Sequence, residues 1–203
     1  MKYRLSLLSL FIALAYTHLL AQHRDYPYFC HFIEAADEEI DFDATEDDRY
    51  LIRASQITKE ILDASGNVAY WDLRANRSIP NATAVILNNK RYIQYNPEFI
   101  ANASAQSYEE WVIYGVFAHE IGHHTNFHLT GKNARHTEEL EADQYTGFIL
   151  YQLKASLAEA QAAVNKLGSS TSSRTHPSKK KRLEAVAKGW NKAKRQAEER
   201  NSS

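Results

Sequence analysis

Two histidines and a glutamate form a His-Glu-x-x-His pattern, made by His119, Glu120 and His123. Residues four apart on a helix lie on one face, so both imidazoles can bind the same metal ion. Zinc is the expected ion, because it accepts imidazole nitrogen and carboxylate oxygen in a tetrahedral shell. Glu120 then stands where a general base can act on a zinc-bound water. The alternative is a chance match, in which two core histidines are satisfied by hydrogen bonds.

The residues around this pattern predict a buried helix. Ser107 and Glu110 form a Ser-x-x-Glu capping box, and the residues from Trp111 to Ala118 carry no charge. A helix that is apolar all round is a buried one. Two histidines and a glutamate would be costly in such a helix without a partner, and a metal ion supplies that partner.

A second pair of candidate residues begins sixteen positions after His123, where Glu139 and Asp143 are again four apart. A catalytic zinc site needs a third protein ligand and leaves its fourth position for water, so Glu139 can complete the set. Asp143 can then accept a hydrogen bond from the far nitrogen of a ligating histidine and fix its tautomer. The alternative is that Glu138, Glu139 and Glu141 form a solvated acidic face.

A third feature is the Thr-His-Pro turn within Arg174–Ser178, with Arg182 downstream. Together with the pattern at 119–123 and the Glu139-x-x-x-Asp143 pair, it resembles the gluzincin peptidases of the CAAX prenyl protease family. That family also includes heat-shock membrane proteases and periplasmic quality-control proteases. The similarity covers about residues 80–190 and is specific at the zinc motifs.

The resemblance implies that both histidines of the pattern and Glu139 bind zinc, and that Glu120 is catalytic. It implies that Asp143 supports a ligand, and that His176 faces the site as a transition-state donor or a displaceable extra ligand. The implied activity is that of a zinc metalloendopeptidase acting on peptides or unfolded proteins, in periplasmic or envelope quality control. The chain departs from the family's best-known members, which have several membrane spans, and from soluble relatives that carry a helical repeat domain.

Residues 1–21 are predicted to be a signal peptide. Lys2 and Arg4 form a basic start, the run from Leu5 to Tyr16 is apolar, and Ala21 is a plausible cleavage residue. The chain is therefore expected to be exported, to the periplasm or the outside, with no membrane span after cleavage. An uncleaved anchor is the alternative. Cys30 is the single cysteine, so no internal disulfide can form.

The remaining residues, 22–203, are predicted to form one α+β domain, mainly helical, with a core at about 44–190 and a disordered tail at 191–203. By the resemblance, this domain is zincin-like. The sheet is expected to be small and antiparallel, beside the active-site helix. The expected elements are a helix from Thr45 to Ser65, strands within 67–80, at Ala82–Leu87 and at Arg91–Tyr95, a long helix from Thr137 to Leu167 and a last helix from Ser178.

Three further histidines, His124, His128 and His136, are predicted to be ordinary polar residues, because their spacing does not place them with the patterned pair. Gly147 is two turns after Glu139 and is expected to let the two motif helices approach closely.

The formal net charge is −1, but the segment from Arg174 onward has ten basic and three acidic residues. A solvated amphipathic helix is the favoured interpretation, and the alternatives are docking of this tail on the acidic body or a basic surface for an acidic partner. No recognisable nucleic-acid module accompanies the tail, so no nucleic-acid partner is expected. The alternative function is a latent or non-hydrolytic zinc-containing module that binds peptides like a chaperone. His176 as a fourth ligand would close the site in that case.

Overall fold

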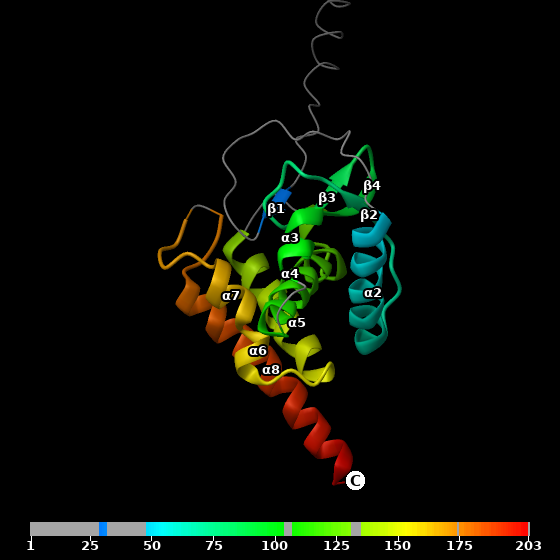
Figure 1. Ribbon diagram of the computed structural model, residues 1–203. Helices are drawn as coiled ribbons and strands as arrows, with labels where there is room; N and C mark the ends of the chain where they lie inside the picture. The colour runs from blue at the N-terminus through cyan, green and yellow to red at the C-terminus, as the bar shows by residue number, and fades with distance from the viewer. Residues whose placement is uncertain (1–28, 32–47, 104–106, 131–134, 174, 203) are drawn as a thin grey trace, which may run out of the picture.

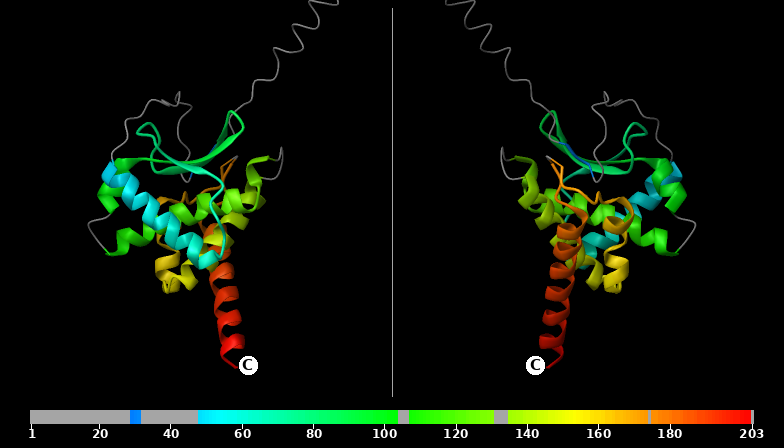
Figure 2. Two further views of the ribbon diagram at one scale, coloured as in Figure 1. Left: turned by 90° about the vertical axis from the view of Figure 1, so that its right-hand side faces the viewer. Right: turned by 90° about the vertical axis from the view of Figure 1, so that its left-hand side faces the viewer.

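The computed structural model describes residues 29–31, 48–103, 107–130, 135–173 and 175–202. The predicted signal peptide at 1–21 lies outside them. A small sheet covers one side of a helical body in all three views (Figures 1 and 2), so the predicted mainly helical α+β class is confirmed. Among the described helices, none combines the length and the apolar character needed to cross a membrane.

The sheet is mixed, where the sequence predicts an antiparallel one. Its strand order is β1 (Phe29–His31), β3 (Ala82–Leu87), β4 (Lys90–Tyr95) and β2 (Asp72–Ala75). β3 and β4 form the predicted hairpin, whose turn residues Asn88 and Asn89 have positive φ angles of 48° and 63°, as the twist of a two-residue hairpin requires. β2 pairs with β4 in parallel. The chain crosses from β2, on one side of β4, to β3 on the other side, and then returns along β4 in the same direction as β2.

Two helices flank the central helix of the fold. α2 (Asp48–Ser65) buries Ala54, Ile57 and Ile61 and is followed by Gly66, with φ at 68°, which suits a helix end. α3 (Pro97–Ala103) begins at the proline where the sequence predicts only the end of β4. α4 (Ser107–Thr125) is buried at every residue from 112 to 124, as its apolar sequence predicts.

The predicted long helix from 137 to 167 is wrong, because the chain breaks after residue 152. α5 (Arg135–Gln152) is followed by Lys154 with φ at 72°, and then by α6 (Leu157–Ala160) and α7 (Ala162–Leu167). Ser156 and Glu159 form a capping box at the start of α6, a local signal that favours a new helix over continuation of the old one.

The last helix, α8 (Lys179–Asn201), packs along α5. A Cβ on Gly147 would lie 1.9 Å from the carbonyl oxygen of Val186, and one on Gly189 would lie 1.8 Å from that of Gln144. Gly147 therefore allows α8 to approach α5 closely. The prediction that it brings the two motif helices, α4 and α5, together is wrong. α8 also continues to Asn201 and extends away from the body (Figure 2), where the sequence predicts a disordered tail.

Candidate metal centre

The centre lies where α4 meets α5, and three predicted ligands converge there. Nε2 of His119 lies 3.1 Å from Nε2 of His123. The Glu139 carboxylate faces both rings, with Oε2 at 3.3 Å from Nε2 of His119 and Oε1 at 3.4 Å from Nε2 of His123. All three side chains are buried, and one donor atom from each lies within 4.8 Å of the others. This group could hold a metal ion.

The pKa values of the three groups follow from their burial and from one another. Burial is the main cause that lowers the pKa of His123 to about 4, so its ring is neutral at pH 7, the form that binds metals. Burial also acts to lower the pKa of His119, but Asp143 and Glu139 outweigh it and raise that pKa to about 9. Burial acts to raise the pKa of Glu139, but its hydrogen bonds with both histidines hold that pKa well below the usual range.

Asp143 lies behind His119, one helical turn along α5 from Glu139. Its Oδ1 is 2.9 Å from Nδ1 of His119, so the ring presents Nε2 to the centre, as the spacing predicts. Arg182 of α8 donates from Nε to Oδ2 and from its terminal nitrogen to Oδ1 of the same carboxylate, both at 2.8 Å. Burial alone would raise the pKa of Asp143, but Arg182 holds it below its ordinary value.

Arg182 is the site residue whose role is missed at the sequence level. Its side chain is 2% exposed, although three lysines precede it in the sequence. The available signal is its position: Val186, Gly189 and Ala193 follow at helical spacing and are buried on the same stripe of α8. A buried arginine on an apolar stripe indicates a buried anionic partner.

His128 is the second correction, because the structure places it against a candidate ligand. The η1 turn (His128–Thr130) brings its Nδ1 to 3.1 Å from Nδ1 of His123, and its Nε2 lies 3.0 Å from Oε2 of Glu141. If His123 offers Nε2 to the centre, its Nδ1–H donates to His128, which in turn donates to Glu141. His119 and His123, the two candidate ligands, are thus each oriented by hydrogen bonds that end on a carboxylate.

The two other histidines lie outside the centre, as the sequence predicts. His124 stacks on Trp71 with 5.2 Å between ring centroids, and its Nε2 is 2.8 Å from the carbonyl oxygen of Tyr92. His136 contacts the carbonyl oxygen of Ser173 at 2.9 Å. Both side chains therefore have structural partners.

Glu120 connects the centre to the sheet. The backbone N–H of Ala84 in β3 donates to Oε2 of this fully buried carboxylate at 2.7 Å, while Oε1 has no hydrogen-bond partner among the described residues. Burial is the main reason that its pKa is raised to about 8. One oxygen is therefore held in place and the other remains available, the arrangement that a proton acceptor requires.

His176 reaches the centre from the loop before α8. Its Nε2 lies 3.4 Å from Oε2 of Glu139, and its Nδ1 lies 2.9 Å from Oγ1 of Thr175. Its backbone N–H donates to Oγ of Ser173 at 3.0 Å, which fixes the turn. The structure thus places all six predicted site residues at one location.

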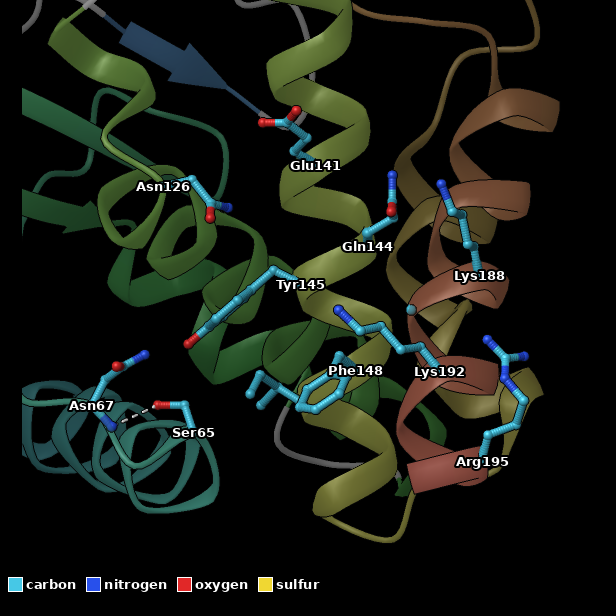
Figure 3. Close-up of a pocket in the computed structure, with 12 residues that line it drawn as sticks. Ser65, Asn67, Asn126, Glu141, Gln144, Tyr145, Phe148, Lys188, Lys192 and Arg195 are labelled. Carbon is cyan, nitrogen blue, oxygen red and sulfur yellow. Dashed lines mark hydrogen bonds between the residues drawn. The ribbon is translucent and has the colours of Figure 1, made fainter. Parts of the chain in front are cut away.

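A cavity of about 400 Å³ lies between α2, α5 and α8 (Figure 3), and none of the candidate ligands His119, His123 and Glu139 lines it. Glu141 stands at one end of it, and Lys188, Lys192 and Arg195 project from α8 along one side. Glu141 therefore touches both this cavity and, through His128, the metal centre.

The fold and site define a mainly helical α+β protein with a candidate metal centre at a buried helix pair. Comparisons with protein-family models, with curated proteins and with solved structures each found no match. The chemistry of the site therefore carries the functional argument by itself.

Proposed function

We propose that the chain is a zinc-dependent metalloendopeptidase. The observation that carries this proposal is the placement of Glu120 beside His119, with one carboxylate oxygen anchored on β3 and the other without a hydrogen-bond partner among the residues that the structure describes. A purely structural metal site has no use for such a group. A hydrolytic site needs one, because the attacking water must lose a proton.

The charges of the buried groups favour a divalent ion. Glu120, Glu139 and Asp143 are buried carboxylates, and Arg182 is their buried cationic neighbour. A divalent ion would displace the protons that His119 and Glu120 otherwise carry at pH 7, with pKa values of about 9 and about 8, and together with Arg182 it would balance all three carboxylates. Two neutral imidazoles and one carboxylate, with a fourth position left open, form the donor set of catalytic zinc sites. Bound zinc would polarise the substrate carbonyl and lower the pKa of its water to about 7.

The residues of the chain then have separate roles in hydrolysis. Oε1 of Glu120 accepts a proton from the water that attacks the scissile carbonyl carbon, and passes it to the amine nitrogen as the C–N bond breaks. Nε2 of His176 donates a hydrogen bond to the carbonyl oxygen as negative charge develops on it. Asp143 and Arg182 keep His119 oriented, and they do not touch the substrate.

The test is cleavage of fluorescein-labelled casein by the full chain and by Glu120→Gln, with zinc measured in both. The variant should keep its zinc and lose about 10²–10⁴-fold in rate, the usual contribution of a general base. Glu184→Gln, an exposed position on α8, is the matched control and should cleave like the unmodified chain. Cleavage by Glu120→Gln at the unmodified rate would falsify the assignment of the base.

A second function has one observation in its favour. His176 lies close enough to Glu139 to act as a fourth ligand, and a closed shell would leave a latent or non-hydrolytic module that binds peptides. Full zinc occupancy with no cleavage, and cleavage that appears in His176→Ala, would support latency. Loss of cleavage in His176→Ala from an active chain would support the role as a donor.

The proposed location and substrates of the enzyme rest on features of the sequence. The motifs resemble those of the soluble exported branch of the CAAX prenyl protease family, and residues 1–21 have the features of a signal peptide. On these grounds the proposed substrates are peptides or unfolded proteins of the periplasm or cell envelope. Detection of the chain in a periplasmic extract, with residues 1–21 removed, is the expected outcome of fractionation.

A further inference from the structure

β3 is the strand next to the proposed catalytic glutamate, and both of its edges are paired. β4 pairs with it along all six residues from Ala82 to Leu87. On the other edge, β1 pairs antiparallel with Thr83, Ala84 and Val85 (Figure 1). A peptide that joins the sheet as a strand needs a free edge. At β3 such a peptide must therefore displace one of these two neighbours.

The register places β1 at the site and not at the far end of the strand. Cys30, the middle residue of β1, pairs with Ala84. Ala84 is also the residue whose N–H donates to Glu120 at 2.7 Å. The backbone of β1 thus lies against the part of β3 that anchors the proposed base.

β1 is the weaker of the two neighbours of β3. Among the described strands, β1 has three residues and pairs on one side, whereas β4 has six residues, pairs on both sides and is joined to β3 by a tight turn. Residues 32–47 separate β1 from α2 in the sequence. A short edge strand contributes few ladder hydrogen bonds, each of modest net value, so a peptide strand can compete with it.

From this arrangement we propose that β1 is an internal competitor for the substrate strand, so that the segment Phe29–His31 holds the enzyme partly latent. The proposal rests on the proposed peptidase function. A peptide pairs antiparallel with Thr83–Val85 only after β1 has left that edge. Its backbone then occupies the position that the backbone of β1 holds beside Glu120.

The first test is the full chain with Cys30→Pro, compared with Cys30→Val. Proline removes the N–H of the central residue and disfavours the strand, whereas valine is a strong strand former that keeps the N–H and lacks the thiol. For Cys30→Pro we expect kcat/KM on labelled casein to rise about tenfold, which equals about 1.4 kcal/mol. Cys30→Val should match the unmodified chain. Zinc content and thermal unfolding confirm that each variant is folded.

A binding measurement separates this proposal from the peptidase function. The probe is a fluorescein-labelled synthetic copy of residues 26–34 with valine in place of cysteine, and the proteins carry Glu120→Gln to prevent cleavage. Its affinity, measured by anisotropy, should be about tenfold higher when Cys30→Pro is added. If Cys30→Pro raises the affinity for the probe but no chain with Glu120 intact cleaves casein, the result supports β1 as a competitor for the peptide and overturns the proposed peptidase function.

Three results would overturn the competitor. One is an active chain whose kcat/KM is unchanged by Cys30→Pro. Another is an equal gain in Cys30→Pro and Cys30→Val, which would assign the inhibition to the thiol and not to the strand. The third is probe affinity that is the same with and without Cys30→Pro.

Discussion

Replacement of Arg182 by methionine would remove the cation that donates two hydrogen bonds to the buried Asp143 carboxylate, and would leave His119 as its neighbour. The two side chains are 2% and 1% exposed, and they share two hydrogen bonds of 2.8 Å. Removal of one partner from a buried ion pair costs about 3–5 kcal/mol, because the remaining charge keeps its desolvation penalty. We therefore expect Arg182→Met to lower the free energy of unfolding by about 4 kcal/mol. Zinc affinity should also fall by about 10–100-fold, because Arg182 no longer fixes the Asp143 carboxylate that orients His119.

Urea unfolding, followed by circular dichroism, measures the first effect. With an m value of about 2 kcal/mol/M, the loss moves the midpoint down by about 2 M. Lys181→Met, at the exposed neighbouring position, is the matched control and should change stability by less than about 0.5 kcal/mol. Asp143→Asn added to Arg182→Met removes the orphaned charge and should restore part of the stability. A loss below about 1 kcal/mol in Arg182→Met, or no recovery in the double variant, would show that Arg182 and Asp143 do not form a buried ion pair.

Three other variants test separate features. Burial lowers the pKa of His124 to about 4, so the stability from its neutral form is present above pH 6.5 and is lost as the pH falls through 4. Between pH 7.5 and 4.5, the free energy of unfolding in urea should therefore fall by about 2–3 kcal/mol less in His124→Gln than in the unmodified chain. Equal falls in the two chains would contradict this. In a chelator competition, His128→Ala should weaken zinc binding by about 10–100-fold, whereas His136→Gln should leave it unchanged. Equal zinc affinities of the two variants would exclude a role for the hydrogen-bond chain from His123 through His128 to Glu141. Gly147→Ala should lower the free energy of unfolding by about 1–3 kcal/mol, because its Cβ would lie 1.9 Å from the carbonyl oxygen of Val186. An unchanged midpoint of thermal unfolding would show that α5 and α8 are not so close.

The candidate ligands could be predicted because helical spacing is local information. His119 and His123 share a face of any helix that contains them, and so do Glu139 and Asp143. The hairpin of β3 and β4 is equally local, since it depends on alternation around a two-residue turn. These features needed no knowledge of how distant parts of the chain meet.

The supporting residues could not be predicted in the same way. Arg182 reaches Asp143 only because glycines on α5 and α8 let these helices touch. His128 reaches His123 through a turn whose direction is set by Phe127, with φ at 58°. The parallel pairing of β2 with β4 also depends on a crossing of the chain, not on either strand's own sequence. Tertiary contacts decided each of these cases.

The break between α5 and α6 is a different kind of miss. The capping box of Ser156 and Glu159 can be recognised from the sequence, but it lies within a run of good helix formers. The apolar period alone favoured one helix there. The left-handed conformation of Lys154 and the bond from Nε1 of Trp190 to the carbonyl oxygen of Ala155 fix the turn instead.

We propose that His119, His123 and Glu139 hold one zinc ion while Glu120 stands beside it without binding it. Metal analysis of the purified full chain, of Glu139→Gln and of Glu120→Gln, after dialysis against a weak chelator, tests this most directly. We expect about one zinc per chain in the unmodified protein and in Glu120→Gln, and far less than one in Glu139→Gln. No zinc in the unmodified chain, or full retention in Glu139→Gln, would contradict it.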